Sequence, residues 1–126
     1  MLYTTYFSKM SELPDDTIKI IISLYPPDGL VISKDSNTFL CPELAPDEDF
    51  LLAHKRKEIT WDEYTEKFMD KIYTNTNTRR LLKEILIGLS KGKDIALICY
   101  EKDFLHCHRY LIAEYLTRFG IKWKEL

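Results

Sequence analysis

Short apolar runs alternate along this chain with stretches of helical periodicity, a pattern typical of β-α-β units. Residues 2–7 are rich in Tyr and Thr, residues 18–23 are β-branched and almost continuously apolar, and residues 95–99 form a third apolar run. Continuous apolar runs are typical of strands that are buried on both faces of a parallel sheet. We therefore predict at least three parallel strands in these segments, and a final strand at 121–126 that alternates in exposure.

Helix signals lie between these strands. A short helix is predicted to begin at Pro46, because proline suits the first helical position and acidic residues follow it. Thr60 and Glu63 have the spacing of a capping box, so a second helix is predicted to begin there. Thr78 is expected to cap a third helix, which stops at Gly92.

The last predicted helix covers residues 107–119 and directly follows the 95–99 strand and a short loop. Residues 30–45 have no clear period, so a hairpin and a plain loop are both open there. The sequence contains no internal repeat, low-complexity segment or long linker. We predict one α/β domain over residues 1–126, with three layers and a small, mostly parallel, Rossmann-like sheet.

Composition narrows the class of protein. The apolar fraction of 45% is ample for one core, and the net charge of −2 argues against bulk nucleic-acid binding. The sequence has no apolar run of the roughly 18 residues that a membrane helix needs, and its first residues do not form a signal peptide. The three cysteines are an odd number, which argues against a disulfide framework. We expect a cytoplasmic protein that does not bind membranes.

Five chemically useful side chains lie within eleven residues, where the 95–99 strand passes into the last helix. In an open parallel sheet, ligands bind at this carboxyl edge. Arg109 could clamp a phosphate or carboxylate at the helix N-terminus, where the pKa of Cys107 would be lowered. His108 is the natural proton carrier near neutral pH, and Glu101 could serve as a base, nucleophile or sugar-binding carboxylate. Cys99 closes the strand.

We assign catalysis to Glu101, His108 and Cys107, and ligand binding to Arg109, Cys99, Tyr100, Thr5 and Ser23. A purely structural interpretation of the cluster is also open. Cys107 shares a helical stripe with Leu111 and Tyr115, so it could be core, and Arg109 could form an ion pair with Glu101 that holds the loop.

The cluster also resembles the signature of a known family. Cys-Tyr-Glu at 99–101 and Cys-His-Arg at 107–109 are similar to the bacterial domain-of-unknown-function family 488, in which Cys-x-Glu ends a strand and Cys-His-Arg opens a helix. The chain departs from the family pattern at His106 and in residues 27–39. The resemblance implies a three-layer α/β fold with a mostly parallel sheet and a shared site at these residues, and it implies no particular reaction. The similarity extends to residues 3–10, 18–23, 43–46, 55, 59–64 and 120–126.

Several functions are compatible with these residues. The first is an enzyme acting on a small phosphate- or ribose-bearing molecule, although the sequence has no Gly-rich phosphate loop. The second is a module, encoded by a phage or mobile element, that binds or sequesters a small anionic, nucleotide-like or signalling ligand without turnover. The third is a zinc site of Cys99, Cys107 and either His106 or His108, with Cys41 as a remote fourth ligand. The last is dithiol redox chemistry between Cys99 and Cys107. We assign no cofactor, no metal ligand and no oligomeric state from the sequence.

Overall fold

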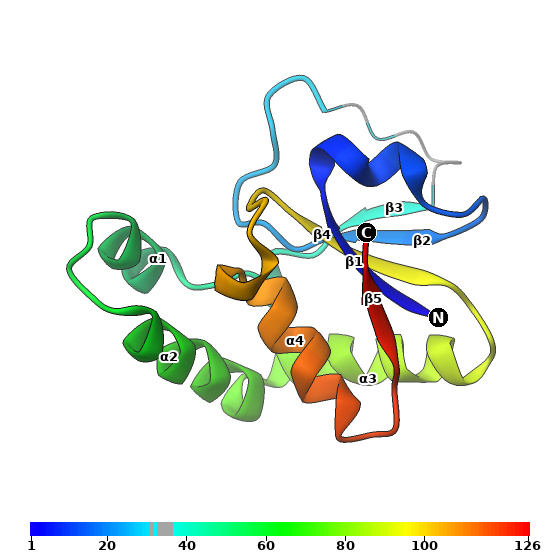
Figure 1. Cartoon of the computed structure of the whole chain (residues 1–126). Coiled ribbons are helices and arrows are strands. Elements are labelled where there is room, and N and C mark those ends of the chain that lie inside the picture. Colours follow the sequence, from blue (N-terminus) through cyan, green and yellow to red (C-terminus); the bar gives the residue numbers. More distant parts are fainter. Residues whose placement is uncertain (31, 33–36) are drawn as a thin grey trace.

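The β-branched and apolar runs of the sequence form a sheet of five parallel strands in the described part of the chain. The computed structural model describes residues 1–30, 32 and 37–126, and its strand order is β3-β2-β4-β1-β5 (Figure 1). The predicted parallel strands at 2–7, 18–23 and 95–99 are confirmed, as is the α/β fold class. The strands are β1 (Leu2–Tyr6), β2 (Ile18–Ile21), β3 (Thr38–Leu40), β4 (Ile95–Cys99) and β5 (Trp123–Glu125).

Helices form in the segments that the periodicity predicts, but the predicted start at Pro46 is wrong, since α1 begins at Glu48 with Asp47 as its cap. The sequence left a hairpin and a plain loop as alternatives for residues 30–45. The described part of this segment contains β3 and η2, and residues 31 and 33–36 lie outside the described part. The described helices are not long and apolar enough for any of them to cross a membrane. They are the 3-10 helices η1 (Phe7–Glu12), η2 (Pro42–Leu44) and η3 (Phe104–His106) and the α-helices α1 (Glu48–Lys55), α2 (Trp61–Thr74), α3 (Thr76–Ser90) and α4 (His108–Thr117).

Two helix starts illustrate how local sequence sets the boundaries. The capping box of α2 is confirmed: the Glu63 amide donates to the Thr60 hydroxyl, and the Thr60 amide donates to the Glu63 carboxylate. The prediction that Thr78 caps α3 is wrong, because Asn75 is the cap and its side-chain oxygen accepts from the Thr78 amide. Thr78 instead lies in the first turn, and its hydroxyl donates to the Glu43 carbonyl.

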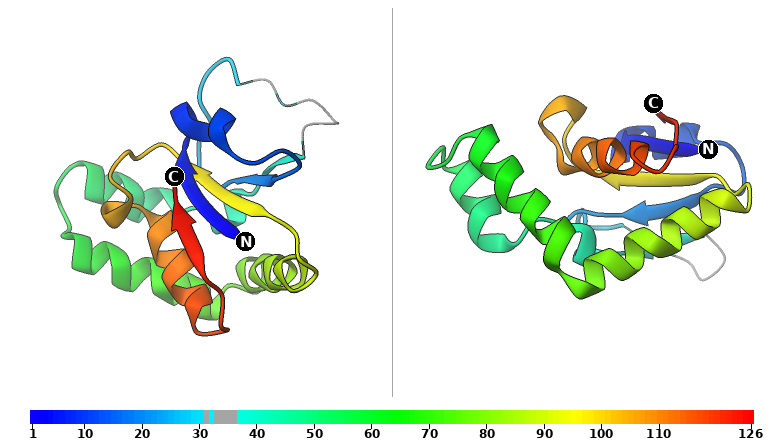
Figure 2. Two further views of the ribbon diagram at one scale, coloured as in Figure 1. Left: turned by 45° about the vertical axis from the view of Figure 1, so that its right-hand side comes forward. Right: turned by 90° about the horizontal axis from the view of Figure 1, so that it is seen from below.

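The two faces of the sheet are covered unequally (Figure 2). On one face α3 and α4 contact the strands, and the larger core on this side extends to α2 and α1, with Phe68 of α2 and Ile112 of α4 among its residues. The other face is covered by η1 and by the chain around Leu13 and Leu30. The fold therefore has a thick helical layer, a sheet and a thin third layer.

The central position of β4 decides where a site can form. This strand pairs with β1 on one side and with β2 on the other, and every residue of β4 is buried. Its last residue, Cys99, therefore emerges at the middle of the carboxyl edge of the sheet. The α4 helix begins close to that edge, after the loop that contains η3 (Figure 1).

The capping box of α2 provides a test of the helical layer. Thr60→Ala should lower the free energy of unfolding by about 1 kcal/mol. The Glu63 amide loses its acceptor, and the reciprocal bond from the Thr60 amide to the Glu63 side chain loses its support. Urea denaturation measures this loss. Thr74→Ala is the matched control, since its hydroxyl bonds only to a carbonyl within the last turn of the same helix. Equal losses in the two variants would contradict the role of the box.

Candidate functional site

A cavity of about 460 Å³ lies at the carboxyl edge of β2 and β4, between the start of α4 and the helices α1 and α2. We call it the β2–β4 pocket. Such a position is where parallel α/β sheets bind ligands. The residues lining the pocket are Ser23, Leu24, Tyr25, Pro46, Leu51, His54, Lys55, Lys57, Tyr64, Cys99, Tyr100, Glu101, Asp103, His106, Cys107 and His108.

Two cysteines and a histidine form the floor of this pocket. Cys99 and Cys107 are each 1% exposed and His108 is 7% exposed. The two sulfur atoms are paired as a disulfide in the structure, and the Cys107 sulfur lies 3.8 Å from Nδ1 of His108. These are the same two cysteines that dithiol redox chemistry, one of the functions left open by the sequence, would use. The two sulfurs and Nδ1 of His108 all lie within 4.8 Å of one another.

His108 is held as a neutral imidazole. Its Nε2 donates to the Ile22 carbonyl at 2.6 Å, which fixes the tautomer and leaves Nδ1 with its lone pair. Burial is the main cause that lowers the pKa of His108 to about 4, and the positive charges of Arg109 and Lys71 lower it further. At pH 7 this side chain is therefore neutral and accepts at Nδ1, and a catalytic role for His108 stays a prediction.

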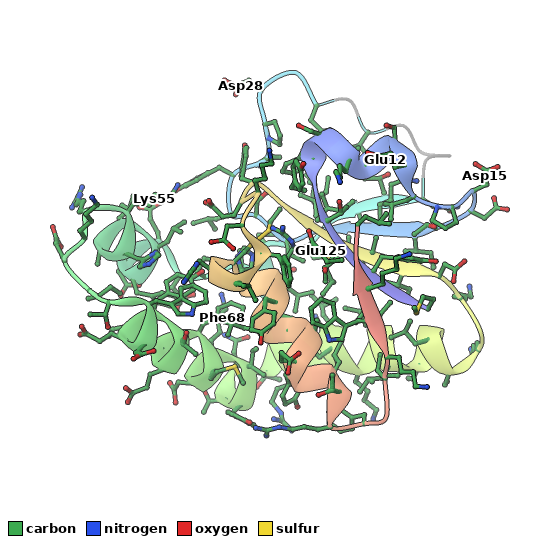
Figure 3. The ribbon with its side chains drawn as sticks, in the orientation of Figure 1. Glu12, Asp15, Asp28, Lys55, Phe68 and Glu125 are labelled. Carbon is green, nitrogen blue, oxygen red and sulfur yellow. A yellow bond between two sulfur atoms is a disulfide. The ribbon has the colours of Figure 1, made fainter. Side chains whose placement is uncertain are left out.

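Arg109 is fully buried and is bound within the protein. Its Nε and Nη2 donate to the two carboxylate oxygens of Glu125, each at 3.0 Å, in a two-pronged ion pair. Nη1 donates to the Cys99 sulfur at 3.1 Å and to the Glu101 carbonyl, and Nη2 reaches the Lys102 carbonyl at 3.5 Å. Figure 3 shows the Glu125 side chain beside α4.

This arrangement changes the interpretation of Arg109. Among the described residues, those lining the pocket do not include Arg109, although the anion clamp requires it there. The alternative of an ion pair with Glu101 is also wrong, since the ionic partner is Glu125 and Arg109 binds only the main-chain carbonyl of Glu101. Arg109 thus ties the loop after β4 to β5, and its five N–H groups are directed to internal acceptors.

The rim of the pocket carries charge of both signs. His54 and Lys55 come from the end of α1 and Lys57 from the turn that follows it, and the two lysines are exposed. Opposite them lie Glu101, which is exposed, and Asp103. The His106 ring nitrogen lies 2.7 Å from the Asp103 carboxylate, and this hydrogen bond is the main cause that lowers the pKa of Asp103.

The remaining predicted ligand-binding residues lie in different places. Ser23 and Tyr100 line the pocket, and the Ser23 hydroxyl, in a residue that is 8% exposed, has no hydrogen-bond partner among the described residues. Thr5 is fully buried and does not line the pocket within the described part of the chain. It pairs with Ile98 in the sheet.

Sequence reasoning missed the contribution of α1. His54 of this helix lines the pocket and is half-buried, and its ring centroid lies 4.9 Å from that of Tyr64. Tyr25 also enters the pocket, with its hydroxyl bonded to Glu48. The basic run at the end of α1 was visible in the sequence, but only the tertiary fold brings it opposite Glu101.

The buried ion pair predicts a large effect on stability. Arg109→Ala should lower the free energy of unfolding by about 3–5 kcal/mol, because it leaves the Glu125 carboxylate without its buried partner. Arg109→Lys should restore only part of the loss, since an ammonium cannot form the planar fork. Urea denaturation measures both, with Arg80→Ala on the exposed face of α3 as control. A loss no larger than that of the control would refute the structural role.

The neutral state of His108 predicts a pH dependence. The unfolded chain protonates this histidine below a pKa of about 6.5, whereas the folded protein keeps it neutral down to about 4. Stability is therefore lost as the pH falls from about 6.5 to about 4, by about 3 kcal/mol in total. Denaturation midpoints between pH 7 and pH 5, with reductant and EDTA present, measure this slope. His108→Gln should flatten it, while His106→Gln should not; an unchanged slope in His108→Gln contradicts the assignment.

Comparison with known proteins supplies the family. Neither the curated proteins nor the solved structures include a match to this chain. The family model described as the active DUF488-N3 subclade matches residues 3–120, which contain every residue that lines the β2–β4 pocket. Because this match covers nearly the whole chain, and because the Cys-x-Glu and Cys-His-Arg segments meet at one pocket, the chain belongs to the DUF488 family.

Proposed function

We propose that this protein is an enzyme that acts on a small phosphate- or ribose-bearing molecule, such as a nucleotide, in the β2–β4 pocket. One observation carries the proposal: a pocket at the carboxyl edge combines a cationic rim, an exposed carboxylate and a buried hydroxyl that has no partner among the described residues. These are the groups that bind a phosphate and a sugar and that perform acid–base chemistry.

The anionic end of the ligand is proposed to face the end of α1 and the start of α4. Lys55 and Lys57 supply exposed positive charge on the pocket rim (Lys55 is labelled in Figure 3). The first turn of an α-helix also leaves backbone amides without helical partners, and these amides attract anions. Arg109 takes part indirectly, because it fixes the main chain of Glu101 and the position of Cys99.

Glu101 is proposed to be the catalytic carboxylate. Its side chain is exposed in the pocket while its carbonyl is held by Arg109, so the carboxylate is presented from an anchored backbone. Glu101 and Tyr64 both line the pocket, and burial, followed by the negative charge of Glu101, raises the pKa of Tyr64. From this position Glu101 can bind a ribose hydroxyl or act as base or nucleophile.

Cys107 and His108 are proposed to act at the pocket floor when the thiols are reduced. Nδ1 of the neutral His108 lies 3.8 Å from the Cys107 sulfur, so it can accept a hydrogen bond from the reduced thiol and orient it toward the ligand. The Ser23 hydroxyl is free to bind the ligand beside them. The description of the matching subclade as active supports an enzyme ahead of a module that only binds its ligand.

The test is conversion of a nucleotide panel. Reduced protein is incubated with nucleoside mono-, di- and triphosphates and dinucleotides, and products are detected by mass spectrometry. We expect at least one compound to be converted, and Glu101→Gln to slow the reaction by about 100-fold or more, the usual contribution of a positioned acid or base. Asp15→Asn removes an exposed carboxylate on the far side of the molecule and should have no effect (Figure 3).

Other outcomes discriminate between functions. A panel member that binds in calorimetry but is recovered intact after denaturation would overturn the enzyme in favour of a sequestering module. The proposal fails entirely if no panel member is converted or bound.

A further inference from the structure

We propose that Cys99 Sγ, Cys107 Sγ and His108 Nδ1 form a binding site for one thiophilic divalent metal ion, Zn²⁺ by its ligand set, at the floor of the β2–β4 pocket. Two thiolates and an imidazole are ligands typical of zinc. The three atoms converge from the end of β4 and the start of α4, all within 4.8 Å of one another. The site goes beyond the proposed function and does not depend on it.

The geometry of the main chain accommodates an ion. The Cα atoms of Cys99 and Cys107 are 7.9 Å apart, whereas most disulfides span about 4.4–6.8 Å between Cα atoms. The distance of 3.8 Å from the Cys107 sulfur to Nδ1 of His108 is close to the separation of two ligands on one tetrahedral zinc. When the two thiols are reduced, the backbone therefore leaves room for a shared ion between them.

The surroundings prepare each ligand for this role. The Ile22 carbonyl accepts from Nε2 of His108, which is the outer contact that orients most metal-binding histidines and turns the lone pair of Nδ1 toward the metal. Arg109 donates to the Cys99 sulfur at 3.1 Å, which favours the thiolate. His108, Cys99 and Arg109 are all buried, so burial holds both contacts in place.

The charge balance of the buried cluster also favours a divalent cation. The charge of Arg109 is matched by Glu125 in their two-pronged ion pair. Two deprotonated thiols at the pocket floor would therefore carry two buried negative charges, which is costly without a counter-ion. A divalent cation balances them and makes the cluster neutral.

The other sulfur and nitrogen candidates considered from the sequence do not join these three converging atoms in the described part of the chain. His106 is exposed and bound to Asp103, with its ring against Trp61. Cys41 lies near β3 and α3, beside Glu84. Three protein ligands remain, and zinc sites with three protein ligands keep a fourth position for water or substrate, here on the pocket side. In the metal-loaded protein Cys107 is a ligand, and Glu101 is the reactive side chain beside the ion.

The test uses the whole chain without any substrate. Protein reduced with a phosphine and freed of metal by EDTA is titrated with Co²⁺ and then with Zn²⁺ under argon. We expect one ion per chain, the intense visible bands of tetrahedral Co²⁺, a near-ultraviolet sulfur-to-cobalt band, and displacement by Zn²⁺. Cys99→Ser, Cys107→Ser and His108→Gln should each weaken binding by more than about 100-fold, exceeding the loss caused by removing an outer contact. Cys41→Ser and His106→Gln are the matched controls and should bind as wild type.

A second measurement uses only the wild-type protein, so it remains valid if the variants do not fold. In mild denaturant, where local opening exposes these buried thiols, Zn²⁺ should slow the alkylation of Cys99 and Cys107 in the reduced wild-type protein, with the modified positions mapped by mass spectrometry. Cys41 should react at the same rate with and without Zn²⁺. The site is refuted if the sulfur-to-cobalt band is absent or survives in Cys107→Ser, if Zn²⁺ gives no selective protection, or if the two thiols are recovered only as a disulfide. None of these outcomes affects the result of the nucleotide panel, so the metal site and the proposed enzyme activity can be refuted independently.

Discussion

The ion pair between Arg109 and Glu125 is the interaction on which the organisation of the site depends. A guanidinium that is fully buried needs a matched charge and acceptors for its N–H groups, or its desolvation would destabilise the fold by several kcal/mol. Glu125 supplies the charge, and the Thr4 hydroxyl donates to the same carboxylate at 2.6 Å. The pair thus joins α4, β5 and β1. Through the remaining guanidinium donors it also fixes the end of β4 and the loop that carries Glu101.

This constraint determines how the pocket can work. The positive charge of Arg109, which the sequence motif suggests for ligand binding, is instead paired inside the protein. The proposed attraction of an anion would therefore depend on the rim lysines and the start of α4. At the floor, burial keeps His108 neutral, and Arg109 places a donor on the Cys99 sulfur. The cluster could therefore present a hydrogen-bond acceptor and two sulfur atoms to a ligand, or three ligand atoms to a metal ion, as proposed.

Local signals in the sequence predicted most of the fold. The three buried strands follow from runs of apolar residues, and the capping box follows from two residues three positions apart, so neither needs tertiary information. The gathering of Cys99, Glu101, Cys107 and His108 was also predictable, because all four lie within one strand-loop-helix segment. The Asn75 cap was missed because several neighbouring residues are good caps and only the backbone decides among them.

The errors at the site are all long-range. Glu125 lies 16 residues beyond Arg109 and is brought beside it by the pairing of β5 with β1, which no spacing in the motif reveals. The approach of α1 to the carboxyl edge depends in the same way on helix packing. An arginine at a helix start is a reasonable anion ligand by its chemistry, but its burial is a property of the whole fold.

Amide hydrogen exchange in Glu125→Gln tests the central role of the ion pair most directly. The substitution keeps the shape of the side chain and removes its charge. If Arg109 and Glu125 fix the loop after β4, the amides of residues 100–106 should exchange much faster than in the wild type. Exchange in β2 and α3 should change much less, and the ratio of their exchange rates should stay the same. Unchanged exchange in residues 100–106 of a folded Glu125→Gln protein would contradict this role.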